Sequence, residues 1–180
     1  MAKAERQTCY KNVLVYTGCT RHVSGGIHIS SYVLAEFNVA IMREPLDSPK
    51  LAGFASQIDR LNALADTAPG FIWRLQDDGG DATAMRPFGE HLLINMSVWK
   101  DVQSLRDYVY GAAHVSLMRR RRQWFEQMQE RSFVLWWIPA KHRPTLSEAV
   151  ERLEVLRTQG PTDGAFSFRR AFSPPGIVAS

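Results

Sequence analysis

The chain has 180 residues, of which 45% are hydrophobic, and a formal net charge of +4 at pH 7. This composition indicates one globular domain with a real core, and the small positive excess does not by itself indicate a nucleic-acid-binding protein. No apolar run approaches the roughly 20 residues that span a bilayer. Cys9 and Cys19 lack the spacing of a metal site, and a disulfide between them remains an alternative. We therefore expect a reduced, cytoplasmic protein that binds neither membranes nor nucleic acid.

The chain divides into a predicted N-terminal extension at 1–30, a domain at 31–170 and a tail at 171–180. The extension is polar and turn-like, so we expect it to be weakly ordered. From Tyr32, "YVLAEFNVAIM" alternates between two faces with period 2, which predicts a strand. Apolar residues at helical spacing then predict a helix over 51–70, ended by Pro69-Gly70, and "FIWRLQ" predicts a second strand.

A long polar loop containing "DDGGDAT" follows. It lacks the ligand spacing of a calcium loop, so a turn is the simpler interpretation. "HLLINMSVW" predicts a third strand, and Asp101 caps the helix after it, with a bend or break at Gly111 and an end near Phe125. "FVLWWIP" predicts a fourth strand.

The clearest local signal is "RPTLSEAVERLEVLRTQG". Thr145 and Glu148 have the spacing of a capping box, an apolar stripe follows, and Gly160 supplies a C-terminal stop. This pattern predicts a last helix. "AFSF", residues 165–168, is typical of a short edge strand.

The predicted order β-α-β-β-α-β, with a further C-terminal helix, indicates an α+β ferredoxin-like split βαβ subunit with an antiparallel sheet. The second and fourth strands carry apolar residues on both faces, which is typical of a sheet buried on both faces. We predict that two such subunits pair sheet to sheet as a homodimer. Alternatively, the N-terminal extension or the last helix covers the second face.

Several segments resemble a bacterial family of unknown function that belongs to the dimeric α+β barrel superfamily. They are "AEFNVA", "PGFIWRLQDDGGDAT", "LLINMSVWKDVQSLRDYVY", "HVSLMRRRRQWF" and "LWWIPAKHRPTLSEAVERLEVLRTQGPT". The resemblance covers about residues 32–170 and implies the fold and the dimer, but no settled activity. More distant relatives are the antibiotic-biosynthesis monooxygenases and the haem-degrading monooxygenases, which hold a pocket between the sheet and its helices.

The haem-degrading relatives imply a pattern that Asn38, Tyr108 and His114 match in part. The aromatic residue here is Tyr rather than Trp, and the histidine follows it more closely than in those relatives. From the residues alone, His114 lies on a partly apolar stripe of its helix. It is therefore a structural histidine, a pocket acid or base, or a ligand.

Polar groups also gather on one face of the predicted sheet. Glu36 and Asn38 share a face of the first strand, and Asn95, Ser97 and Trp99 share a face of the third. Buried polar groups need partners, so these residues indicate either a partly polar pocket wall or a sheet face that is partly exposed to solvent. A buried Glu36 would have a raised pKa and could act as a general base.

The run Arg119 to Arg122 spans about 300° of a helix, so its four side chains cannot all face one partner. Most of them are expected in solvent, with one or two folded back toward the aspartates of the long loop or toward a pocket with an anionic substrate. The five tryptophans are expected mainly in the core or the dimer interface.

We predict a small-molecule pocket protein of the monooxygenase kind, which acts on a planar hydrophobic or aromatic substrate without a tightly bound metal or other cofactor. Haem binding or degradation through His114, and non-enzymatic ligand binding by a dimer, remain alternatives. The predicted catalytic residues are His114, Asn38 and Glu36. The predicted substrate-binding residues are Trp99, Tyr108, Asn95 and Arg122.

Overall fold

A computed structural model describes residues 31–77, 79–80, 82–83 and 85–176. The predicted extension at 1–30 and the last four residues of the predicted tail lie outside this range. The elements follow in the order β1 (Tyr32–Ile41), α2 (Ala52–Ala55), α3 (Ile58–Asp66), β2 (Phe71–Arg74), β3 (Leu92–Trp99), α4 (Val102–Val109), α5 (Ala112–Arg120), the 3₁₀ helix η1 (Arg121–Gln123), β4 (Phe133–Pro139) and α6 (Leu146–Thr158). No helix in this part of the chain has the length and apolar character that a membrane crossing requires.

The four strands form one antiparallel sheet in the order β2-β3-β1-β4. β1 lies in the interior, pairing with β3 from Leu34↔Trp99 to Ile41↔Leu92 and with β4 from Tyr32↔Pro139 to Asn38↔Phe133. Helices separate β1 from β2 and β3 from β4 along the chain. This is the ferredoxin-like arrangement, and the predicted fold class is confirmed.

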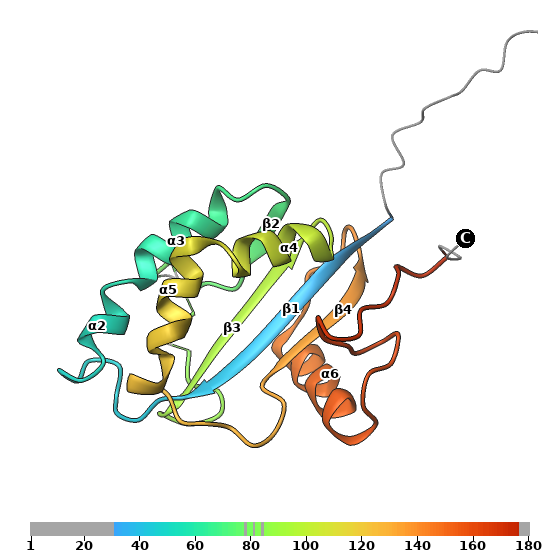
Figure 1. The fold of residues 1–180 in the computed structure, drawn as a ribbon. Helices are drawn as coiled ribbons and strands as arrows, with labels where there is room; N and C mark the ends of the chain where they lie inside the picture. The colour runs from blue at the N-terminus through green and yellow to red at the C-terminus, as the bar shows by residue number, and fades with distance from the viewer. Residues whose placement is uncertain (1–30, 78, 81, 84, 177–180) are drawn as a thin grey trace, which may run out of the picture.

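The alternation along β1 sends successive side chains to opposite layers. Val33, Ala35 and Phe37 belong to a buried cluster that α6 completes with Leu153 and Leu156. Leu34 lies in a second cluster, on the face covered by α3 and α4. Figure 1 shows α2, α3, α4 and α5 on one side of the sheet and α6 on the other.

The last helix therefore covers part of the face that was predicted to pair with a second subunit. α6 packs against β4 and β1, where Ala149, Leu153 and Leu156 are each less than 4% exposed. This is the alternative that the sequence left open. The physical reason is that the α6 stripe and the inner face of β1 are both apolar, and they bury each other within one chain.

Three predicted elements differ from those observed. The helix expected over 51–70 is split into α2 and α3, because the N–H of Gln57 bonds the Phe54 carbonyl in a tighter turn at 2.9 Å. The helix expected to run to Phe125 ends earlier and continues as η1. The second strand is shorter than predicted, with a pairing irregularity between Phe71 and Trp73.

The predicted chain reversals and caps are confirmed. Gly70, which ends the α3 region, has a φ of 82°, and its carbonyl accepts a bond from the Lys100 N–H at 2.7 Å. Asp101 Oδ1 accepts from the Ser104 N–H at 2.8 Å, as an N-cap does. Gly111 separates α4 from α5, and Gly160 follows α6 with a φ of 76°.

The C-terminal segment departs from prediction in two details. Thr145 Oγ1 caps α6 by accepting from the Glu148 N–H at 3.2 Å. The Glu148 carboxylate accepts instead from Trp136 Nε1 at 2.9 Å and contacts His142 Nε2 at 2.7 Å. The predicted edge strand at 165–168 pairs with β4 at a single bridge, where Phe166 and Leu135 exchange two backbone bonds of 2.8 Å.

Candidate functional site

A cavity of about 410 Å³ lies between the sheet and the helices that cover it. The sheet contributes polar side chains from the middle of β1 and β3, and α3, α4 and α5 contribute mostly apolar ones. Its lining includes Glu36, Asn38, Phe54, Ile58, Leu61, Arg74, Asn95, Ser97, Tyr108, His114, Leu117, Arg121 and Phe133. A pocket with apolar walls and a few convergent polar groups is the usual form of a small-molecule site.

Glu36 is the centre of the polar wall. It is 3% exposed, and its carboxylate accepts three hydrogen bonds. Asn38 Nδ2 donates to Oε1 at 2.6 Å, whereas Ser97 Oγ and Asn95 Nδ2 donate to Oε2 at 2.8 Å and 3.3 Å. The cross-strand register produces this cluster, because Glu36 pairs with Ser97 and Asn38 pairs with Asn95.

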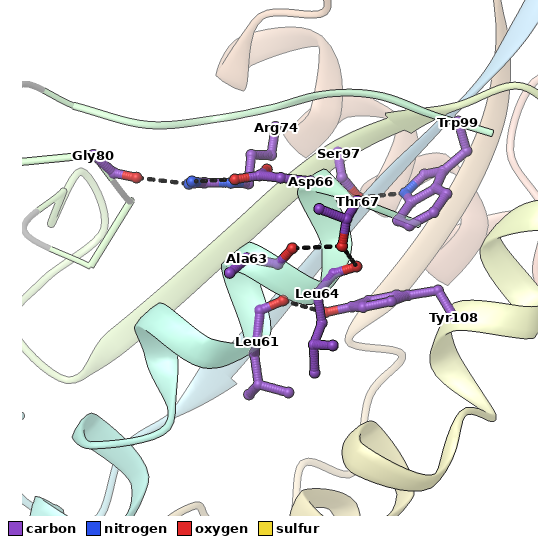
Figure 2. Close-up of polar contacts among 10 residues, drawn as sticks. All are labelled: Leu61, Ala63, Leu64, Asp66, Thr67, Arg74, Gly80, Ser97, Trp99 and Tyr108. Carbon is purple, nitrogen blue, oxygen red and sulfur yellow. Dashed lines mark hydrogen bonds and ion pairs between the residues drawn. The ribbon is translucent and has the colours of Figure 1, made fainter. Parts of the chain in front are cut away.

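An indole group fixes the direction of the bonds behind Glu36. Trp99 Nε1 donates to Ser97 Oγ at 2.9 Å, as Figure 2 shows. An indole N–H can only donate, so the Ser97 hydroxyl accepts from Trp99 and gives its own proton to Glu36. The Ser97 hydroxyl is therefore held with its proton directed at the Glu36 carboxylate.

Burial raises the pKa of Glu36 to about 7, although the bonds from Asn38 and Ser97 act in the opposite direction. Removal from water is the larger effect, because a carboxylate in an apolar setting loses more hydration than a few neutral donors return. A carboxyl group that titrates near neutral pH can both accept and return a proton in a working cavity.

Tyr108 stands opposite this wall on α4. Its hydroxyl donates to the Leu61 carbonyl at 3.2 Å, as drawn in Figure 2. Burial, with smaller contributions from Glu36 and Asp66, raises the pKa of Tyr108 to about 12, so the phenol remains protonated. Its ring stacks on Trp99 at 5.1 Å and therefore holds α4 against β3.

His114 faces the same cavity from α5, with its ring 5.4 Å from that of Tyr108. Burial lowers the pKa of His114, and the nearby Val109 backbone opposes this shift in part. Its Nδ1 is buried and makes no hydrogen bond of normal geometry to any described residue. His114 is thus a neutral imidazole at neutral pH in the cavity wall.

The cations near the cavity differ in how firmly they are held. Arg74 Nε and Nη2 bind the Asp66 carboxylate at 2.8 Å and 3.2 Å, and Nη1 donates to the Gly80 carbonyl at 2.7 Å (Figure 2). Arg121 also lines the cavity, and no ion pair holds its side chain among the described residues. Arg122, which was predicted to bind substrate, is exposed and lies outside the lining.

The structure brings most of the predicted site residues together. Glu36, Asn38, Asn95, Tyr108 and His114 line one cavity. Trp99 is 1% exposed and supports the wall from behind rather than forming it. The set of predicted site residues lacked Ser97, Arg74 and Arg121. Ser97 was predicted to lie on the same strand face as Asn95, and the arginine run was expected to turn one or two side chains toward the loop or a pocket, but Arg74 carries no sequence signal for the cavity.

The described residues contain no group of three or more His, Cys, Asp or Glu side chains that could hold a metal ion. In the loop with "DDGGDAT", Asp77 Oδ1 accepts from the Gly79 N–H at 2.7 Å, which is an ordinary turn. Asp78 and Asp81 lie outside the described residues.

A family model described as "Domain of unknown function (DUF3291)" matches residues 33–179. No curated protein matches the chain. The similar solved structures include a protein of unknown function from Nitrosomonas europaea, at 14% identity over 64% of this chain and 95% of that one, with a TM-score of 0.41. They also include SnoaB, a cofactor-independent oxygenase from Streptomyces nogalater, which is 16% identical, with the match covering 65% of this chain and 98% of SnoaB at a TM-score of 0.39. MupZ from Pseudomonas fluorescens is 14% identical, with the match covering 83% of this chain and 100% of MupZ at a TM-score of 0.39.

Proposed function

The chain belongs to the family described as Domain of unknown function (DUF3291), and from its site we propose that it binds a planar, largely apolar small molecule and oxygenates it without a bound cofactor. One observation carries this proposal. Glu36 is a buried carboxyl in the wall of a mostly apolar cavity, three donors orient it, and its pKa lies near 7. These are the properties of a general base that works at neutral pH.

The chemistry begins with removal of a proton from the substrate. A ring CH₂ group that a ketone conjugated with it makes acidic loses a proton to the Glu36 carboxylate, and the resulting carbanion transfers electrons to O₂. One oxygen atom becomes a carbonyl on that carbon, and the other leaves as water with the two hydrogens of the CH₂ group. The neutral Tyr108 and His114 rings form the wall beside the substrate.

Oxygen uptake with anthrone, a planar compound with such a CH₂ group, tests the proposal. We expect Glu36→Gln to lower turnover by about 10²- to 10⁴-fold, the usual contribution of a general base. Glu151→Gln, on the exposed side of α6, is the matched control and should leave turnover unchanged. Equal turnover in Glu36→Gln and the unaltered protein would remove Glu36 from the mechanism. Binding of anthrone with no turnover would instead support a non-enzymatic ligand-binding protein.

The haem alternative has less support from the site. The Asn38 amide binds Glu36, and the Tyr108 hydroxyl binds the Leu61 carbonyl. These contacts favour a site organised around a carboxyl group. A Soret band on haem titration that disappears in His114→Ala would replace the proposal with haem binding.

We also propose that the protein is a homodimer. Beside α6, the same sheet face carries Trp73, Leu75 and Leu92, which are only partly buried within one chain. A second copy placed against them would complete the burial of this face. In sedimentation at micromolar concentration, we expect a species of twice 20.4 kDa. A species that stays at 20.4 kDa would contradict the dimer.

A further inference from the structure

A second cavity, of about 390 Å³, lies beside the first, between α3 and α5. Figure 1 shows these two helices on the same side of the sheet. The second cavity is lined by Gln57, Arg60, Leu61, Ala112, Ser116, Leu117, Arg120 and Trp124. Leu61 and Leu117 also line the first cavity, so the two cavities share these leucines as a common wall.

The second cavity differs from the first in charge. Arg60 and Arg120 are the charged residues of its lining, and both are cations. Among the described residues, no ion pair or hydrogen bond engages the Arg60 side chain. Arg120 lies over the Trp124 ring at 4.9 Å, and its Nε donates to Gln123 Oε1 at 3.3 Å, so both terminal nitrogens of its guanidinium remain available. Two cations around one hollow favour an anion, and a guanidinium matches a carboxylate in shape.

We propose that the two cavities form one extended site, in which the second takes an anionic group, a carboxylate, carried on a short chain by the planar part of the ligand. The placement of the planar part rests on the function proposed above. The chain would pack against Leu61 and Leu117, and the carboxylate would lie between Arg60 and Arg120. The four arginines of the run are all exposed, but they divide by position: Arg120 lines the second cavity, Arg121 lines the first, and Arg119 and Arg122 line neither.

A matched pair of probes separates the anionic contact from the apolar one. 4-(Naphthalen-1-yl)butanoate and its methyl ester share the planar part and the chain, and they differ in charge. By calorimetry we expect the carboxylate to bind about tenfold tighter than the ester, the scale of a charge-assisted contact that is partly open to water. Arg60→Gln and Arg120→Gln should each remove most of this preference, and Arg60→Lys should keep part of it.

Arg119→Gln is the control, because Arg119 shares the last turn of α5 with Arg120 but lines neither cavity. It should retain the full preference, whereas an equal loss in Arg119→Gln would indicate general surface charge and overturn the proposal. Tight binding of the ester with no preference for the carboxylate would overturn the extended site and leave the first cavity in place. Failure of both probes to bind would contradict the extended site and the proposed pocket together.

Discussion

Glu36→Gln is expected to be more stable than the unaltered protein at pH 8, by about 2–3 kcal/mol of unfolding free energy. Burial raises the pKa of Glu36 from 4.5 to about 7 in the folded chain, so the folded state binds this proton more tightly than the unfolded state does. The stabilisation by the bound proton is complete below pH 4.5 and is lost as the pH rises through 7. At pH 8 the buried carboxylate is charged and destabilising, whereas glutamine is neutral at every pH.

The hydrogen bonds of the site allow this substitution. The carbonyl oxygen of the new glutamine in Glu36→Gln can accept from Ser97 and Asn95. Its NH₂ group can donate to the Asn38 side-chain oxygen if the Asn38 amide flips. Urea unfolding of both proteins between pH 4.5 and 8 measures the effect. The difference in stability should shrink toward zero as the pH falls. If Glu36→Gln is instead less stable than the unaltered protein at pH 8, the folded protein stabilises the charged carboxylate, and Glu36 is too weak a base for the proposed chemistry.

Leu156→Ala is expected to lower the unfolding free energy by about 2–5 kcal/mol, the range for a leucine removed from a packed core. Leu156 is fully buried in the cluster that α6 forms with the sheet. The loss arises from the transfer of its methyl groups to water and from the cavity left behind. This prediction tests whether α6, rather than a second subunit alone, covers this part of the sheet.

Val150→Ala is the matched control for Leu156→Ala, because Val150 lies on the same helix but is 37% exposed. Its effect should stay below about 1 kcal/mol in the same urea experiment. Equal effects at the two positions would contradict the docking of α6 through its Leu153 and Leu156 side.

The elements that the sequence predicted best are those with strong local signals. The period-2 alternation of β1, the cap at Asp101, the break at Gly111 and the Thr145 cap of α6 all depend on near neighbours in the chain. The split between α2 and α3 was missed, because apolar residues continue at helical spacing through the turn. The side of the sheet on which α6 packs depends on tertiary contacts, which one amphipathic stripe does not specify.

The polar side chains of the site that lie on the strands were predictable, because strand alternation and pairing determine which side chains share a sheet face. Alternation placed Glu36 and Asn38 on one face, and antiparallel pairing brought Asn95 and Ser97 beside them. For the arginine run, the sequence did not determine which side chains turn toward the cavity. Arg121 and Arg122 are neighbours in η1, where the chain leaves α5, and Arg121 lines the cavity whereas Arg122 does not. Arg74 depends on a partner, Asp66, that lies across a turn on another element.

The most direct test of the proposed function is the titration of Glu36 itself. Carbon-13 NMR of the glutamate side-chain carboxyl, assigned by comparison with Glu36→Gln, gives the pKa of this group in the folded protein. A midpoint near 7 would agree with a buried general base in the cavity. A midpoint near or below the ordinary value of 4.5 would show a carboxylate that its neighbours keep charged, and the proposed chemistry would lose its base.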